Sequence, residues 1–234
     1  YMQSLLQGLP LETQSFTYAA PSQLANILGG TGGVMDLYNA IFGKTPTKTE
    51  TEATQELASN NDGWKILFDG TNFDSWHMFN GGEVNDSWTI KDDAMVLTPS
   101  ENAGNIVTNE EFKNFELSLE WKISEGGNSG FFWGVQEDKK YKEPYQTGPE
   151  IQVLDNERHP DAKAGETHQA GALYDMIAPS EKVARPAGEW NTCILVINHK
   201  TNQGSVTLNG TEIVKFPVHG DKWEEMIANS KFKG

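Results

Sequence analysis

The chain has 234 residues, of which 37% are hydrophobic, so it can bury a complete core and is not disordered throughout. Its 18 basic and 33 acidic residues give a formal net charge of −15 at pH 7, which repels phosphate backbones and anionic lipids and argues against nucleic acid as a ligand. No apolar run is long enough for a membrane span. The single cysteine, Cys193, has no partner for an intrachain disulfide and is expected on a buried strand.

Residues 1–43 differ in composition from the rest of the chain, because they carry little charge and much Gln, Ser and Gly. Apolar side chains recur there at helical spacing and precede a glycine suited to end a helix: Val34, Leu37, Tyr38, Ile41 and then Gly43. An isolated helix of this length is marginal in water. We therefore expect residues 1–43 to be a partly helical segment that docks on its own domain or on another protein chain.

Residues 44–62 are rich in Thr and Glu and have neither periodicity nor bulky side chains, which is typical of a flexible linker. The domain boundary is therefore placed in this stretch, and residues 63–234 are predicted to form one domain. Since the chain begins at Tyr1 and not at Met, either a leader has been removed or the chain is a fragment.

Short strands separated by turn residues dominate the sequence after residue 63. The predicted strands cover residues 64–68, 87–90, 94–98, 115–123, 130–135, 150–154, 191–198, 205–208 and 212–215. Asn209-Gly210 is a strong signal for a tight turn between the last two. The only good helix in this part covers Lys222–Ser230, after Asp221 as a possible cap. This pattern indicates a mainly β protein with an antiparallel β-sandwich.

The polar candidates for chemistry concentrate in the segment from Glu150 to Asp161. On a strand, Glu150 and Gln152 share one face, which places a carboxylate beside an amide and suits a sugar. Asp155 ends the strand. Two carboxylates in one concave site can have their pKa values driven apart, which provides for general acid and base catalysis.

The loop after that strand contributes Arg158, His159 and Asp161. One interpretation places Arg158 in an ion pair that holds a long loop in place. Another interpretation is a divalent metal site made by Asp155, His159 and Asp161, since imidazole and carboxylate are ordinary ligands. The spacing of these residues is not a recognised metal signature, so no cofactor is certain and a divalent metal stays open.

Further candidates lie on other segments. Glu120 is the stronger of two acids on the strand 115–123, the other being Glu116, which is expected to be solvated. Asn128 begins a stretch of small residues that lets a ligand approach the backbone. Tyr174 and Asp175 could return to the face of Glu150, and His168 lies in a loop of the kind that lines pockets. Four rings are suited to stacking on a sugar: Trp76, His77, Trp133 and Tyr145.

Five sequence motifs in order resemble the 3-keto-disaccharide hydrolase domain family. They are Asp69–Trp76, Glu116–Gly130, Glu150–Asn156, Ala172–Asp175 and Pro186–Asn191. The resemblance covers about residues 63–234 and implies a concanavalin-like jelly roll. That family continues beyond the point where this chain stops, so the domain is expected to lack its last strand and to expose a sheet edge. Residues 1–43 weakly resemble a segment of phage virion proteins.

The resemblance implies a hydrolase or lyase that acts on 3-keto-glycosides by removing the C2 proton and eliminating the group at C1. Glu150 or His159 is assigned as the base, Asp155 and Glu120 as support or acid, and Arg158 or a bound cation as the electrophile at the ketone. Gln152, Tyr174, Asp175, Asn128, Trp133 and Trp76 are assigned to substrate binding. The expected location is extracytoplasmic, secreted or periplasmic, and alternatively a virion.

Two other functions stay open at this point. The same sandwich can hold a glycan without chemistry, as a lectin-like module does, because a fold does not establish a reaction. A virion structural or host-attachment protein could also carry this domain.

Overall fold

The computed structural model describes residues 16–19 and 64–233. In this part of the chain the strands are β1 (Phe16–Ala19), β2 (Trp76–Met78), β3 (Trp88–Lys91), β4 (Ala94–Leu97), β5 (Ile106–Thr108), β6 (Phe115–Ile123), β7 (Asn128–Phe132), β8 (Glu150–Leu154), β9 (Asn191–Asn198), β10 (Gln203–Leu208) and β11 (Thr211–Phe216). Three short 3-10 helices, η4 (Pro144–Gln146), η5 (Pro160–Lys163) and η6 (Glu166–His168), and the helix α4 (Asp221–Ala228) complete these elements. The protein is mainly β, as the sequence predicts.

Seven antiparallel strands form one large sheet in the order β11-β10-β9-β6-β1-β4-β3. Along β9 the side chains alternate between buried and partly exposed, so Cys193, Leu195 and Ile197 enter the core. Each of these faces an apolar residue of β6, for example Leu117 opposite Leu195. The period of two thus makes one face of the sheet apolar and buried. The other face carries polar side chains on β6 and also the partly exposed Ile194 and Val196 on β9.

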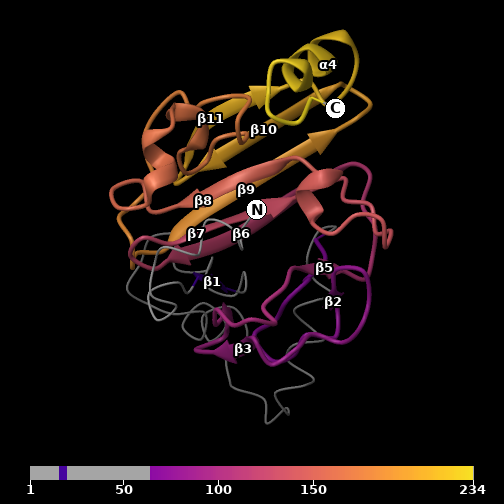
Figure 1. Ribbon diagram of the computed structural model, residues 1–234, viewed down its shortest axis with the longest axis vertical. Helices are drawn as coiled ribbons and strands as arrows, with labels where there is room; N and C mark the ends of the chain where they lie inside the picture. Colours follow the sequence, from indigo (N-terminus) through magenta and orange to yellow (C-terminus); the bar gives the residue numbers. More distant parts are fainter. Residues whose placement is uncertain (1–15, 20–63, 234) are drawn as a thin grey trace, which may run out of the picture.

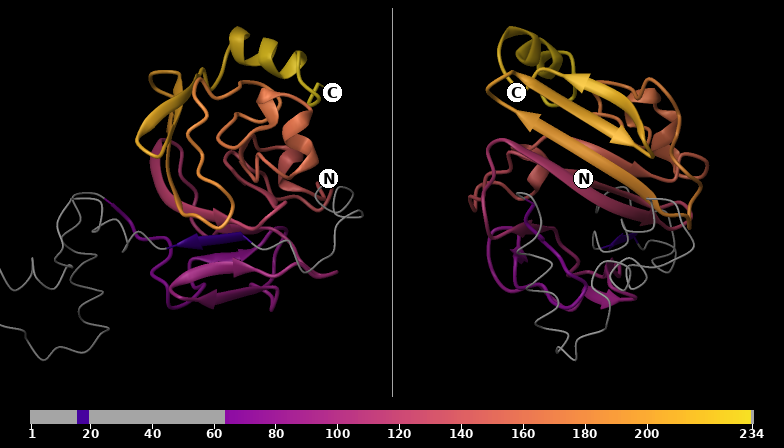
Figure 2. Two further views of the ribbon diagram at one scale, coloured as in Figure 1. Left: turned by 90° about the vertical axis from the view of Figure 1, so that its left-hand side faces the viewer. Right: turned by 180° about the vertical axis from the view of Figure 1, so that it is seen from behind.

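A smaller layer made by β7 and β8 covers this apolar face. The two strands pair antiparallel with Gly130 opposite Gln152, and Ile151 and Val153 are completely buried. β7 and β8 lie in front of β6 and β9 in Figure 1 and behind them in the right-hand view of Figure 2. The molecule is therefore an antiparallel β-sandwich.

A segment after η6 adds an irregular third neighbour to β8. Gln152 N donates to Ala172 O at 3.1 Å and Tyr174 N donates to Glu150 O at 3.0 Å, with Ile151 opposite Leu173 between them. This pairing places Tyr174 directly beside Glu150.

The helix α4 closes one end of the sandwich (Figure 1). Its Trp223 packs against Phe216 of β11, with ring centroids 6.3 Å apart, and Phe216 in turn stacks on Trp133 from the smaller layer at 5.4 Å. The chain that follows α4 then runs back to the smaller layer. None of the helices in the described part of the chain is long and apolar enough to cross a membrane.

The strand boundaries predicted for β6, β8 and β9 are confirmed, whereas the strand predicted at 64–68 is wrong. Leu67 O accepts a hydrogen bond from Trp76 Nε1, and Trp64 is 46% exposed, so this stretch is held by a side chain and not by a strand partner. β1, β2 and β5 were not predicted, and β2 and β5 have only three residues each, which is too few for a period to appear. The helix expected at Val34–Ile41 and the linker at 44–62 lie outside the described residues.

The predicted tight turn at Asn209-Gly210 also fixes a neighbouring loop. Both residues have left-handed backbones, with φ of 49° and 85°. The Asn209 amide donates to Val183 O and to Asn191 Oδ1, each at 2.8 Å, and Asn209 Oδ1 accepts from Thr192 N at 3.0 Å. The side chain therefore connects the hairpin to the 180–190 loop.

We expect Asn209→Gly to lower the free energy of unfolding by about 1–3 kcal/mol, because Gly keeps the left-handed backbone but loses these three hydrogen bonds. Urea unfolding would measure the change. Asp92→Gly is the matched control, since Asp92 is exposed and has a φ of 52°. Equal effects of the two substitutions would contradict a role for the Asn209 side chain.

Candidate functional site

A pocket of about 250 Å³ lies beside β7 and β8 and between segments that are far apart in the sequence. Its lining residues come from both strands, from η4, from the segment after η6 and from the chain end after α4. They are Asn105, Asn128, Phe132, Glu143, Pro144, Tyr145, Glu150, Gln152, Tyr174, Lys231 and Phe232. The pocket thus combines four aromatic rings with several polar groups, which is the usual composition of a small-molecule site.

Glu150 is an acidic residue of this pocket whose pKa is shifted far from its ordinary value. It is partly buried at the start of β8, and a Cβ atom on Gly130 of β7 would clash with its carboxyl group. The glycine therefore provides the space that the carboxyl occupies. Burial raises the pKa of Glu150 from 4.5 to about 8, while nearby Lys231 opposes the rise and nearby Asp161 adds to it.

Gln152 lies on the same face of β8, two residues further along. Its side chain is 1% exposed, and its Nε2 donates to His168 O at 3.4 Å. Its Oε1 has no hydrogen-bond partner among the described residues. A buried acceptor without a partner is costly, so this oxygen is suited to accept a hydrogen bond from a ligand hydroxyl.

Tyr174 is the first member of a chain of hydrogen bonds behind the pocket. Its hydroxyl donates to Asp161 Oδ2 at 2.8 Å, and Asp161 Oδ1 lies 2.9 Å from His168 Nδ1. His168 Nε2 lies 2.9 Å from Asp175 Oδ1, and Asp175 Oδ2 accepts from the backbone N–H of Lys231 at 2.7 Å. Asp161, His168 and Asp175 therefore support the pocket wall from outside its lining.

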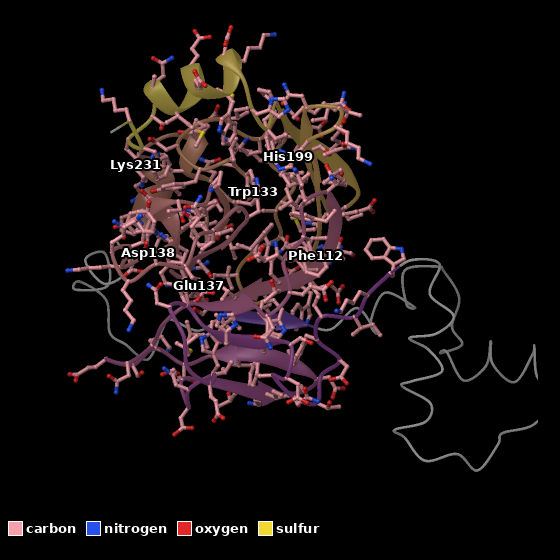
Figure 3. All side chains as sticks on the ribbon, turned by 90° about the vertical axis from the view of Figure 1, so that its right-hand side faces the viewer. Phe112, Trp133, Glu137, Asp138, His199 and Lys231 are labelled. Carbon is pink, nitrogen blue, oxygen red and sulfur yellow. The ribbon has the colours of Figure 1, made fainter. Side chains whose placement is uncertain are left out.

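Lys231 is a residue that sequence reasoning missed. Its Nζ lies 4.0 Å from the centre of the Tyr174 ring and 5.3 Å from that of Phe232. Figure 3 shows Lys231 on the chain end below α4. Burial lowers the pKa of Lys231, and the carboxylates of Glu150, Asp175 and Asp161 oppose the change. A lysine on a polar chain end gives no sequence signal of such a position.

Asp155, Arg158 and His159 do not line this pocket. Asp155 is 2% exposed and accepts hydrogen bonds from backbone N–H groups, including Gly126 N at 2.7 Å and Glu157 N at 3.1 Å. Arg158 lies within 3.5 Å of Asp155, Glu125 and Glu157. This geometry fits the interpretation in which Asp155 and Arg158 hold the loop after β8.

His159 is the N-cap residue of η5 and is 3% exposed. Its Nδ1 accepts a hydrogen bond from Asp161 N at 3.1 Å, so this nitrogen caps the short helix. Burial lowers its pKa, against the effect of Asp161 and Asp155. Among residues 16–19 and 64–233 no group of three or more His, Cys, Asp or Glu side chains is placed to hold a metal ion, and this includes the predicted set of Asp155, His159 and Asp161.

The remaining predicted residues divide between pocket and core. Asn128 and Tyr145 line the pocket with Glu150. Trp133 is 9% exposed inside the sandwich (Figure 3), because it packs on Phe216. Trp76 packs against the core and bonds Leu67 O.

Glu120 lies on the opposite face of β6 from Trp121, away from the apolar core, and is 8% exposed. Burial raises its pKa and Arg185 opposes the rise. Because side chains alternate along β6, Glu120 points away from the layer that carries Glu150. It therefore does not line the pocket.

His77 lies at a surface contact and not in the pocket lining. Its ring is hydrogen-bonded to Asn109 and to Glu137, at 2.6 and 2.8 Å, and the bond with Glu137 raises its pKa. Glu137 lies in the loop between β7 and η4 and is labelled in Figure 3. The contact therefore fixes this loop to β2.

Comparisons with known proteins place these features in a family. A family profile described as a 3-keto-alpha-glucoside-1,2-lyase-like domain matches residues 63–234. A protein of Bacteroides thetaiotaomicron named 3-keto-disaccharide hydrolase is 35% identical over 209 residues, which cover 82% of this chain and 71% of that protein. The profile begins at residue 63, so the virion resemblance of residues 1–43 stays a prediction.

Two crystal structures from Parabacteroides distasonis, both named only provisionally as glycosyl hydrolases, are similar in fold. The first has a TM-score of 0.66 and 32% identity, and the match covers 81% of this chain and 85% of that chain. The second has a TM-score of 0.56 and 26% identity, over 67% of this chain and 73% of the other.

The raised pKa of Glu150 predicts a pH-dependent stability. The Glu150 carboxyl binds its proton more tightly in the folded protein than in the unfolded chain. Its contribution to the free energy of unfolding is therefore largest below about pH 4.5 and is lost as the pH rises to about 8. The free energy of unfolding, relative to that of Glu150→Gln, should therefore decline over this interval and be constant outside it. Urea unfolding between about pH 4 and pH 9, a range that includes both the ordinary pKa of 4.5 and the raised pKa of about 8, would measure this decline.

Glu116→Gln is the control for this prediction, because Glu116 is an exposed acid on β6. Its unfolding free energy should run parallel to that of the unaltered protein at every pH. A pH-independent difference between the unaltered protein and Glu150→Gln would show that Glu150 titrates alike in both states.

Proposed function

This chain belongs to the family of 3-keto-alpha-glucoside-1,2-lyase-like domains, and on that premise we propose that it cleaves 3-keto-glycosides by elimination. A ketone at C3 of the sugar acidifies the proton on C2. Glu150 removes this proton, the bond between C1 and the glycosidic oxygen breaks, and its electron pair leaves on that oxygen, which takes up a proton from water. Addition of water to the unsaturated sugar completes a net hydrolysis.

The observation that carries this proposal is the carboxyl of Glu150 in a partly buried pocket. A general base works best when its pKa is near the operating pH, and burial raises the pKa of Glu150 to about 8. Once ionised, such a carboxylate is a stronger base than one in water. His159, the alternative base, caps η5 and lies outside the pocket lining, so the geometry favours Glu150.

The rest of the pocket supports a sugar as the ligand. Gln152 Oε1 needs a hydrogen-bond donor, and a sugar hydroxyl provides one. Phe132, Tyr145 and Phe232 present aromatic surface, which packs on the C–H face of a pyranose. A volume of about 250 Å³ is slightly below the usual range of small-molecule sites and suits one sugar ring better than a long glycan.

Purified protein should release the aglycone from a 3-keto-glucoside and leave the parent glucoside intact, since the parent lacks an acidic C2 proton. Glu150→Gln should lower kcat by at least about 100-fold, because the amide cannot take the proton. Glu116→Gln should retain activity. Chromatography of the products with both substrates provides the measurement.

The pH dependence tests the role of Glu150 as base. If ionised Glu150 is required in the free protein, kcat/KM should rise about tenfold per pH unit up to about pH 8 and then level off. An activity that instead falls above this pH would identify Glu150 as the acid for the leaving group.

A lectin-like module is the second candidate, and Gln152 Oε1 supports binding in either case. The two functions differ in turnover. Calorimetric binding of both glucosides without product formation, with or without added divalent metal, would replace the enzyme proposal by the lectin one.

A further inference from the structure

Resting on the proposed function, we propose that Lys231 is a catalytic residue whose ammonium group binds the C3 ketone oxygen and neutralises the enolate formed there. Lys231 and the candidate base, Glu150, line the same pocket. Among the described lining residues Lys231 is the only one with a positively charged side chain.

The location of the Lys231 ammonium follows from its contact with Tyr174 and from its electrostatic interaction with Glu150. Its Nζ lies 4.0 Å from the centre of the Tyr174 ring, and Tyr174 is adjacent to Glu150 through the hydrogen bond from Tyr174 N to Glu150 O at 3.0 Å. Its charge acts on the Glu150 carboxyl, and the effect is reciprocal. Ammonium and carboxyl therefore share one pocket, in which a single sugar ring can meet both.

The backbone of Lys231 is fixed by Asp175. Asp175 has a left-handed backbone, with a φ of 59°, which is uncommon for a residue other than glycine. Its N–H donates to Thr167 O at 3.0 Å, and its carboxylate binds both His168 Nε2 and Lys231 N. The strained conformation is thus held in place by contacts on both sides.

The remainder of the hydrogen-bond chain returns to the same lysine. His168 contacts Asp161, and Asp161 accepts from the hydroxyl of Tyr174, whose ring lies against Lys231 Nζ. The contacts therefore form a closed loop that begins at the backbone of Lys231 and ends at its side chain. Such a loop orients the ammonium before substrate binds, which is the condition for effective electrostatic stabilisation.

The reaction needs a positive group at this position. When Glu150 takes the C2 proton, the C–H electron pair forms the C2–C3 double bond and the carbonyl pair moves onto oxygen. This oxygen then carries a full negative charge in a partly buried pocket, where an adjacent ammonium stabilises it more than water would. Collapse of the enolate restores the carbonyl, forms the C1–C2 double bond and breaks the bond from C1 to the glycosidic oxygen. That oxygen leaves with the electron pair and takes up a proton from water. Arg158, the electrophile expected from sequence, lies instead with Glu125, Asp155 and Glu157.

Kinetics test this role with Lys231→Met, Lys231→Arg and the exposed control Lys200→Met. Lys231→Met should lower kcat by about 100- to 1,000-fold, the effect of removing one oxyanion donor. Lys231→Arg should keep at least about ten times more activity than Lys231→Met, since it retains the charge. The losses should be equal for nitrophenyl and methyl 3-keto-glucosides, because enolate formation does not depend on the leaving group.

Two kinetic results would overturn the proposal. One is a kcat of Lys231→Met within about threefold of the unaltered protein on both substrates, well below the loss expected for an oxyanion donor. The other is a loss confined to the methyl glycoside, which would assign Lys231 to the leaving group.

Binding provides a test that does not depend on turnover. In Glu150→Gln protein, calorimetry should show tighter binding of a 3-keto-glucoside than of the parent glucoside. Adding Lys231→Met should reduce this preference by about tenfold, within the range for a hydrogen bond to a charged group. An unchanged preference would contradict the proposal. If the unaltered protein shows no turnover but the preference depends on Lys231, the proposed reaction fails and the ketone site stands.

Discussion

The pairing of β8 with a neighbour on each side is the constraint on which the candidate site depends. On one side β7 places Gly130 next to the Glu150 carboxyl, where a larger residue would clash. On the other side, backbone hydrogen bonds hold Tyr174 beside Glu150. Ile151 and Val153 anchor the opposite face of the same strand in the core. The position of one carboxyl is thereby tied to the packing of the whole sandwich.

Burial and neighbouring charges together set the ionisation of the two charged groups in the pocket, Glu150 and Lys231. Burial works against the ionised forms of both Glu150 and Lys231, while their mutual attraction favours them. Asp161 and Asp175 add negative charge behind the pocket and at the same time bind His168 between them. A pocket of this kind can accept a neutral sugar and then respond to the negative charge that develops on it during reaction.

The comparisons and the geometry support different levels of the functional argument. Family membership rests on the match over residues 63–234 and on the identity to a named 3-keto-disaccharide hydrolase. The choice of Glu150 over His159, and of Lys231 over Arg158, rests on which side chains line one pocket. A sandwich alone does not establish a reaction, so these assignments depend on the site and not on the fold.

The sequence by itself determined the β-sandwich, the turn at Asn209-Gly210 and the polar face that carries Glu150 and Gln152, because these follow from a period of two and from local turn preferences. It could not distinguish site residues from loop supports among Asp155, Arg158 and His159, which share the same chemistry and the same stretch of chain. Nor could it place Lys231, which lies 81 positions after Glu150 in the printed sequence. Only the tertiary structure decided which polar groups meet, because the packing of α4 and the contacts behind the pocket bring distant segments together.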